Sequence, residues 1–452
     1  MAYINRRAFL AGTAAGAFAS LLHPAGAYAQ NTSPILIRGS NIFDGSSAEL
    51  TAGMDVLIES GLVTGIGPNL SATGAEVIDA DGRTLMPGLI DMHWHALMAT
   101  STINVVLNSD PSYITLVAAE TNRDALMRGF TTVRDVGGNV FPLVRATREG
   151  RIIGPRIYPS GPYVGQTGGH GDFRPPVAVP AGPGEKFDFF ARIGMSLLAD
   201  GVPEVMQRSR EILRMGSTQI KAMAGGGVSS DYDPLDVVQF TFEEMKAIVD
   251  VAKNWNTYVT VHAIGEAAAL QAIEAGVLCI EHGHLLSGDG LQMVKDKGAW
   301  LSMQAILDDE DAIPFPEGSE NQRKFLQVTE GTESVYTTAR ELGVKMVWGT
   351  DTLFDPELAK KQGKQLAKLG RWFPNHEALA QATSKAGELC QACGPRDPYG
   401  NGTIGVVAEG GHADLLLVNG NPLEDIDLVA DAETNFAMIM KGGVIHKNTL
   451  DS

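Results

Sequence analysis

The sequence predicts an α/β protein in which a parallel (β/α)8 barrel of the TIM type carries a small β-sandwich domain built from both chain ends. Two patterns lead to this prediction. Between residues 88 and 398, short apolar runs alternate with helical patterns, which is typical of a parallel barrel. Residues 30–87 and 399–452 instead contain short strand-like runs bounded by Gly, Pro and Asn. A chain of 452 residues is long enough for one large domain and a smaller one.

Residues 1–29 are expected to be a signal peptide rather than part of the fold. Arg6 and Arg7 precede a weakly apolar stretch, and the segment ends in the small-residue site Ala27-Tyr28-Ala29. This order resembles a twin-arginine export signal cleaved after Ala29, which predicts a periplasmic or secreted protein. A retained membrane anchor is the alternative. It is less favoured because the apolar stretch is shorter than the ~20 residues that span a bilayer, so no stable span is expected after processing.

Composition and charge exclude some classes of partner and site. The chain has 53 acidic and 35 basic side chains and a net charge of −18, which becomes −20 when the two arginines of residues 1–29 are removed. Such an acidic protein is not expected to bind nucleic acid, because phosphate binding needs basic surface. Its three cysteines are too few for a disulfide framework, and the lone C-x-x-C at Cys390 and Cys393 lacks the second pair of a zinc ribbon.

Each barrel strand is predicted from an apolar run that follows a turn or helix. The eight candidate strands lie near residues 89–95, 131–136, 156–162, 218–224, 258–263, 279–284, 299–305 and 345–351. Two segments, 163–215 and 306–330, exceed normal loop length, and long segments after barrel strands build substrate sites. The acidic run Asp308–Asp311 in the second segment is interpreted as a solvated loop.

Five of the apolar runs end in residues that can bind a metal ion. His93 and His95 are two positions apart, so their side chains point to the same side of a strand. The other runs carry Lys221, His262, His282 and Asp351 at or near their C-terminal ends. Because the C-terminal ends of barrel strands meet at one rim, these side chains are expected to converge on a metal site. The alternatives are core histidines satisfied by backbone groups, and an Asp351 that only forms a turn or caps a helix.

Lys221 is unusual because it lies within the apolar run Gln219-Ile220-Lys221-Ala222-Met223-Ala224, where a buried ammonium group is costly. A lysine that reaches the surface or pairs with an acid is one interpretation. The other is a carboxylated lysine, because burial favours the neutral amine, which can add carbon dioxide. The two oxygens of the resulting carbamate can bridge two cations.

Several longer motifs make the chain resemble the amidohydrolase superfamily. Within it, the chain is similar to the imidazolonepropionase-like and Xaa-Pro-dipeptidase-like metallopeptidases, a group that includes amidohydrolases acting on ochratoxin. The resemblance covers nearly all of the chain after residue 29. It rests on Pro87-Gly88-Leu89-Ile90-Asp91-Met92-His93-Trp94-His95, Thr132-Val133-Arg134-Asp135, Gln219-Ile220-Lys221, Val261-His262-Ala263, Glu281-His282-Gly283, Gly349-Thr350-Asp351 and Gly410-Gly411-His412-Ala413-Asp414-Leu415.

This resemblance implies a centre of two divalent metal ions, with Zn²⁺ as the expected metal. The positions matching His93, His95 and Asp351 hold one ion, those matching His262 and His282 hold the other, and a carboxylated Lys221 bridges both together with a hydroxide. The hydroxide attacks the amide carbonyl, and the catalytic Asp351 passes a proton to the leaving amine. Related enzymes often form homo-oligomers, which is expected here too.

His170 and Tyr232 are candidate substrate contacts. His170 lies on a glycine-rich loop after the third predicted strand, where a histidine of related peptidases contacts the reacting carbonyl, so a catalytic role is expected. Tyr232 follows the fourth strand and is expected to bind a substrate carboxylate through its hydroxyl. Either residue could instead be an ordinary loop residue. His284 is expected behind the ligands, and Trp94 is expected to pack in the core.

The predicted function is hydrolysis of the amide bond of a dipeptide or N-acyl amino acid, as in a carboxypeptidase or prolidase. Ochratoxin A hydrolysis is an activity of the same kind. A cyclic-amide hydrolase or a deaminase on the same fold is the alternative. Many deaminases use one metal ion and lack a bridging lysine, so Lys221 argues against them, whereas cyclic amidases with this lysine stay open. A non-catalytic binding protein is disfavoured because all six candidate ligands are present.

Overall fold

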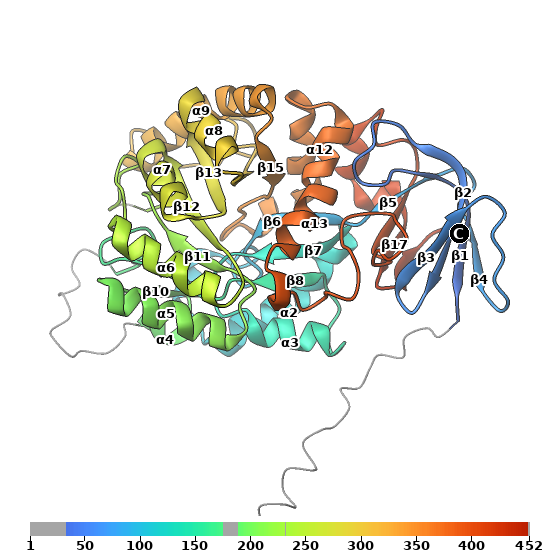
Figure 1. Ribbon diagram of the computed structural model, residues 1–452, viewed down its shortest axis with the longest axis horizontal. Coiled ribbons are helices and arrows are strands. Elements are labelled where there is room, and N and C mark those ends of the chain that lie inside the picture. Colours follow the sequence, from blue (N-terminus) through green and yellow to red (C-terminus); the bar gives the residue numbers. More distant parts are fainter. Residues whose placement is uncertain (1–32, 175–188, 231, 451–452) are drawn as a thin grey trace, which may run out of the picture.

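The computed structural model describes residues 33–174, 189–230 and 232–450. The expected signal peptide, residues 1–29, lies outside the described residues. Two bodies of regular structure are seen: a helix-covered α/β body, and a sheet that contains strands from both ends of the chain (Figure 1). Among the described residues, no helix is long and apolar enough to cross a membrane.

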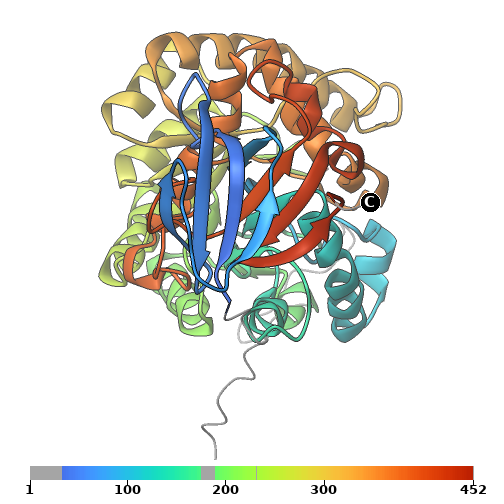
Figure 2. The same ribbon diagram turned by 90° about the vertical axis from the view of Figure 1, so that its right-hand side faces the viewer.

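The terminal strands form one mixed sheet of eight strands in the order β18-β17-β16-β5-β1-β2-β3, with β4 paired to β1. In Figure 2 the strands from the two ends of the chain lie side by side. Their contact is the antiparallel pair of β5 and β16. The strands are β1 (Ile35–Ile42), β2 (Thr51–Glu59), β3 (Leu62–Gly67), β4 (Glu76–Asp79), β5 (Thr84–Pro87), β16 (Leu415–Val418), β17 (Phe436–Lys441) and β18 (Val444–Asn448).

The expectation of a β-structure built from both ends is confirmed, but its described strands form a single continuous sheet rather than two separate layers. The first half of β1 pairs with β4 and its second half pairs with β5. Between the two halves, Gly39 has a φ of +64°, a conformation that favours glycine and lets the strand change direction. Apolar side chains from both chain ends, including Ile37, Leu85 and Met438, are packed together in the core of this sheet.

The central segment has the predicted parallel, barrel-like architecture. It contains two parallel sheets, β6-β7-β8 and β10-β9-β11-β12-β13-β14-β15, and backbone hydrogen bonds join them at two places. The backbone N–H of Thr218 donates to the carbonyl of Pro159 at 2.8 Å, and that of Asp351 donates to the carbonyl of His93 at 2.8 Å. The strands that match the eight predicted ones are β6 (Leu89–Trp94), β7 (Phe130–Asp135), β8 (Arg156–Pro159), β11 (Ile220–Met223), β12 (Val259–Gly265), β13 (Cys279–Leu285), β14 (Trp300–Met303) and β15 (Lys345–Trp348).

The helices of the central body cover the parallel sheets, and local sequence signals determine where these helices begin and end. Helix α6 begins with a capping box, in which Thr241 and Glu244 bond to each other's backbone N–H groups. Helices α5, α7 and α9 each end at a left-handed glycine. The helices are α1 (Ile103–Asn108), α2 (Pro111–Met127), α3 (Phe141–Arg148), α4 (Phe189–Ile193), α5 (Val202–Met215), α6 (Phe242–Asn254), α7 (Glu266–Ala275), α8 (Gly288–Asp296), α9 (Glu320–Leu342), α10 (Pro356–Lys360), α11 (Gln362–Ala367), α12 (Asn375–Gln381), α13 (Ser384–Gln391) and α14 (Ala432–Asn435).

The two long segments contain more order than the sequence analysis expected. Segment 163–215 includes the short strands β9 (Tyr163–Gly165) and β10 (Ser196–Leu198) and helices α4 and α5. The acidic run in the second segment is not simply solvated. Its carboxylates form ion pairs with Lys361, Lys364 and Lys368, so residues 309–311 are tied to the chain after β15.

A largely buried ion pair joins the central body to the terminal sheet. Arg156 on β8 donates from Nε and Nη2 to the two carboxylate oxygens of Asp414, at 2.7 and 3.0 Å. Burial raises the pKa of Asp414, but the Arg156 charge outweighs this and the pKa lies below its usual value. The backbone N–H of Gly442 donates to the same carboxylate at 2.6 Å. Asp414, which directly precedes β16, therefore connects β8 with the turn after β17.

Candidate metal centre

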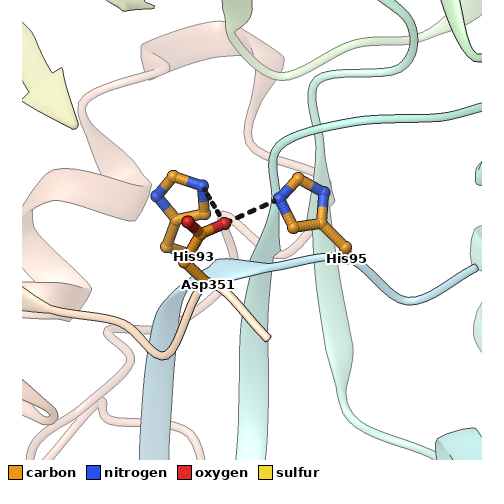
Figure 3. Close-up of side chains that lie close together, drawn as sticks. All are labelled: His93, His95 and Asp351. Atoms are coloured by element: carbon orange, nitrogen blue, oxygen red, sulfur yellow. Dashed lines mark hydrogen bonds and ion pairs between the residues drawn. The ribbon is translucent and has the colours of Figure 1, made fainter. Parts of the chain in front are cut away.

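His93, His95 and Asp351 form a compact group at the C-terminal ends of β6 and β15 (Figure 3). One ligand atom from each residue lies within 4.8 Å of the others. The Oδ1 atom of Asp351 is 3.1 Å from His93 Nε2 and 3.2 Å from His95 Nε2. The structure thus brings together three of the predicted ligands, in a set of nitrogen and oxygen donors that suits Zn²⁺.

The close approach of β6 and β15 depends on Gly349 and Asp91. A β-carbon at Gly349 would overlap the backbone of His93. The buried Asp91 carboxylate accepts the backbone N–H of His93 at 3.0 Å and both the N–H and hydroxyl of Thr350, at 3.1 and 2.8 Å. Asp351 itself has a φ of +53°, which is strained for a residue with a side chain. These contacts hold Asp351 beside the two histidines.

His262 and His282 lie next to this group. Their ring centroids are 4.3 Å apart, and the His282 ring is 5.0 Å from that of His93. The Nε2 atom of His262 bonds to the Gly226 carbonyl at 3.0 Å, and the Nδ1 atom of His282 bonds to Gln304 Oε1 at 2.7 Å. Since these oxygens accept, those nitrogens carry the protons. The lone pairs are then on His262 Nδ1 and His282 Nε2, where they are available to a metal.

Lys221 is buried among these residues, with 1% of its surface exposed. Burial lowers the pKa of its amine, although the Glu281 and Asp351 carboxylates oppose this. Its charge in turn lowers the pKa values of His93, His95, His262 and His282, so it lies within electrostatic reach of all four. Lys221 lies on β11, which pairs with β12, the strand that carries His262.

The electrostatics of the cluster favour metal binding. Burial lowers the pKa of His95 to about 4 and places those of His262 and His282 well below the usual value, so these imidazoles are neutral, as metal ligands must be. Burial also acts on His93, but the carboxylates of Asp351 and Glu281 raise its pKa overall. The buried Nδ1 atom of His95 has no hydrogen-bond partner among the described residues. The donor set thus fits a metal centre.

A buried ion pair behind His93 carries a role that the sequence analysis did not assign. Glu281 accepts from His93 Nδ1 at 2.9 Å and from Arg134 Nη2 at 2.5 Å, and the Thr260 hydroxyl also donates to it. Arg134 further donates from Nε to the Met92 carbonyl at 2.7 Å. Both charged side chains are completely buried. This chain of contacts fixes the His93 ring with Nε2 facing Asp351.

The two candidate substrate residues are placed differently. The His170 ring stacks on His262 with centroids 4.1 Å apart, so the structure brings it to the cluster. Tyr232 is 48% exposed, and no contact joins it to the cluster within the described part of the chain. His284 lies behind His282, where its Nε2 bonds to the Gln304 carbonyl at 3.1 Å. Trp94 is buried in an apolar cluster, as expected for a packing residue.

The Glu281 contact predicts an effect on metal affinity. Glu281→Gln removes the charge that orients His93, so the affinity for metal should fall about 10–100-fold, measured by competition with a chelator. Asp414→Asn is the matched control, because it disrupts another arginine–carboxylate pair, Arg156–Asp414, which lies outside the cluster. The control should lower the thermal midpoint without changing metal affinity. Metal binding by Glu281→Gln as tight as in the wild type would contradict the orienting role.

Known proteins resemble the chain over most of its length. The sequence profile of the amidohydrolase family matches residues 84–447. Ochratoxinase from Aspergillus niger is 31% identical over 380 residues, which cover 80% of this chain and 75% of that protein. A solved prolidase complexed with N-methylphosphonate-L-proline has 32% identity and a TM-score of 0.83, covering 92% of this chain and 100% of that chain. A Xaa-Pro dipeptidase with methionine bound in its active site has 27% identity and a TM-score of 0.78. The match covers 92% of this chain and 100% of that chain.

The matched region includes every residue of the cluster, from His93 to Asp351. It also includes strands of the terminal sheet on both sides of the central body. The relatedness to ochratoxinase and the metal-competent group of His93, His95 and Asp351 agree with this match. This chain therefore belongs to the amidohydrolase family and is a metal-dependent hydrolase of carbon–nitrogen bonds.

Proposed function

We propose that this amidohydrolase cleaves the amide bond of dipeptides or N-acyl amino acids and releases a C-terminal amino acid. The observation that carries the proposal is the convergence of four histidines and Asp351 in one cluster, with the buried Lys221 on the strand next to that of His262. Support for the substrate class comes from relatives whose structures hold a proline phosphonate or methionine. Ochratoxinase, named for a different substrate, is a further relative.

We propose that the cluster holds two divalent ions, with Zn²⁺ as the metal, on a closed (β/α)8 barrel. His93, His95 and Asp351 would hold one ion, and His262 and His282 the other. Lys221, carboxylated at its buried amine, would bridge them. Ions in such a site polarise a carbonyl oxygen and lower the pKa of water, so that a nucleophile is available near neutral pH.

Asp351 and His170 are the residues proposed to handle protons and the substrate carbonyl. The Asp351 side chain is 23% exposed, whereas the side chains of His93, His95 and His282 are 1–6% exposed, so it is the member of this group that is most open to a substrate. Burial raises the pKa of Asp351, but His93 and His95 lower it well below its usual value, so the carboxylate is ionised. It can therefore take a proton and return it to the leaving amine. His170 would contact the carbonyl oxygen.

Other parts of the proposal rest on the sequence. Tyr232 would bind the substrate carboxylate, for which an exposed hydroxyl beside the loop of Asp233 is suited. Export is proposed from the twin-arginine pattern in residues 1–29, and homo-oligomerisation from the family resemblance. A cyclic-amide hydrolase remains the second interpretation, since a bridging lysine serves either reaction.

The substrate class is tested with a panel of dipeptides and N-acyl amino acids that differ in the C-terminal residue, together with ochratoxin A and a set of cyclic amides. Release of free amino acid, followed by mass spectrometry, is expected from the linear amides. Cleavage of the cyclic amides alone would contradict the proposal and favour the second interpretation.

Replacing Lys221 tests the bridge. Lys221→Ala, and Lys221→Met, which keeps most of the side-chain volume, should lose most of the amidase activity and at least one of two metal ions per chain, measured by elemental analysis. Lys345→Ala is the control, because Lys345 is exposed at the start of β15, where it pairs with Glu388 and lies over the Trp300 ring. Full activity and full metal content in Lys221→Met would refute the bridging role.

A further inference from the structure

The loop after β11 holds the His170 ring in a tight slot. This loop, residues 225–230 and 232–238, is closed by a bridge between Gly225 and Val238. The Nδ1 atom of His170 is 2.9 Å from Asp233 Oδ2, and the ring lies flat on His262 at an interplanar angle of 17°. A β-carbon at Gly227 would overlap the His170 ring. The loop and His262 therefore restrict the His170 ring to this position.

The Asp233 carboxylate acts as an acceptor in this slot. Its Oδ2 atom also accepts the backbone N–H of Gly227 at 3.1 Å. The backbone N–H of His170 donates to Gln239 Oε1 at 2.9 Å. Because Asp233 Oδ2 accepts from the ring, the proton of His170 lies on Nδ1 and its free nitrogen is Nε2. The Asp233 side chain is 1% exposed and that of His170 is 16% exposed, so only the imidazole can meet a substrate.

A buried lysine fixes the loop that carries Asp233. The Nζ atom of Lys324, on α9, donates to the backbone carbonyls of Gly227, Ser230 and Asp233 at 3.0, 2.7 and 3.0 Å. All three donor positions of the ammonium group are used, which compensates for its burial. Asn321 on the same helix donates to the Val228 carbonyl at 2.8 Å. The position of Asp233 is therefore set from α9 as well as from β11.

We propose that Asp233 is a positioning residue for His170, which fixes its Nδ1–H form and its orientation so that Nε2 is the nitrogen that meets the substrate carbonyl. Lys324 contributes by holding the loop. This inference deepens the proposed function and rests on it.

A double-mutant cycle on kcat tests the coupling. Asp233→Asn keeps the size of the side chain but removes its charge, and kcat on the best amide substrate should fall about 10–100-fold with a smaller change in KM. In a His170→Gln background, Asp233→Asn should not lower kcat any further, because the histidine through which Asp233 acts is absent. Asp236→Asn, at an exposed position of the same loop, is the control and should keep wild-type kcat in both backgrounds.

An equal loss of kcat in both backgrounds would overturn the proposal, since Asp233 would then act on the fold or the metals. Metal content is measured for each variant and should stay at the wild-type value. If Asp233→Asn does not fold, Lys324→Gln is used in the same cycle, and its loss of kcat should likewise disappear in the His170→Gln background.

A second measurement needs no substrate and separates this proposal from the proposed function. Diethyl pyrocarbonate reacts with an exposed imidazole nitrogen that has a lone pair, and peptide mapping measures its reaction at His170. The reaction should be slower in Asp233→Asn than in the wild type and in Asp236→Asn. If the wild type cleaves no linear amide, the proposed function fails, yet a slower reaction still supports the His170–Asp233 coupling. Equal rates would overturn the coupling itself.

Discussion

The hydrogen bonds of Asp91 are the constraint on which the metal centre depends. This buried carboxylate takes the N–H of His93 at the end of β6, the N–H and hydroxyl of Thr350 after β15, and the side-chain amide of Gln362. It thereby connects the first and last strands of the barrel-like body. Asp351 follows Thr350 directly and bonds through its own N–H to the His93 carbonyl. These hydrogen bonds thus hold the Asp351 carboxylate beside His93 and His95.

Charge compensation explains how so many polar groups are buried together. Arg134 is buried beside the carboxylate of Glu281, and their opposite charges reduce the cost of burial. Backbone strain accumulates at the same place, since His282 and Asp351 both have positive φ. Backbone strain and buried charges lower the stability of a fold. We therefore attribute their presence here to the geometry of the metal ligands, which they maintain.

Much of the site was predictable from the sequence because the histidines and Asp351 lie at the ends of apolar runs, at a rim that parallel strands share. The structure places His93, His95 and Asp351 together, with His262 and His282 beside them and Lys221 on the strand next to that of His262. The Glu281–Arg134 pair was missed, although both are charged residues in apolar runs, the same signal that singled out Lys221. Their partners could not be read from the sequence, because the pairing depends on which side chains face each other across the barrel.

Other features escaped prediction for similar physical reasons. Strands β9 and β10 are too short to give a recognisable apolar pattern. The Asp308–Asp311 run looks solvated until its lysine partners, about 50 residues later in the sequence, are brought beside it. Asp233 gives no local signal either, because its role depends on the position of His170 on a different loop. The features that could not be predicted therefore depend on contacts between residues far apart in the sequence, and not on local secondary-structure propensity.

Anomalous diffraction from crystals of the metal-loaded enzyme, collected on both sides of the zinc absorption edge, tests the central claim most directly. The account predicts an anomalous peak between His93 Nε2, His95 Nε2 and the Asp351 carboxylate, with a second peak beside His262 and His282. Metal-loaded crystals without a peak at the His93, His95 and Asp351 group would contradict the account.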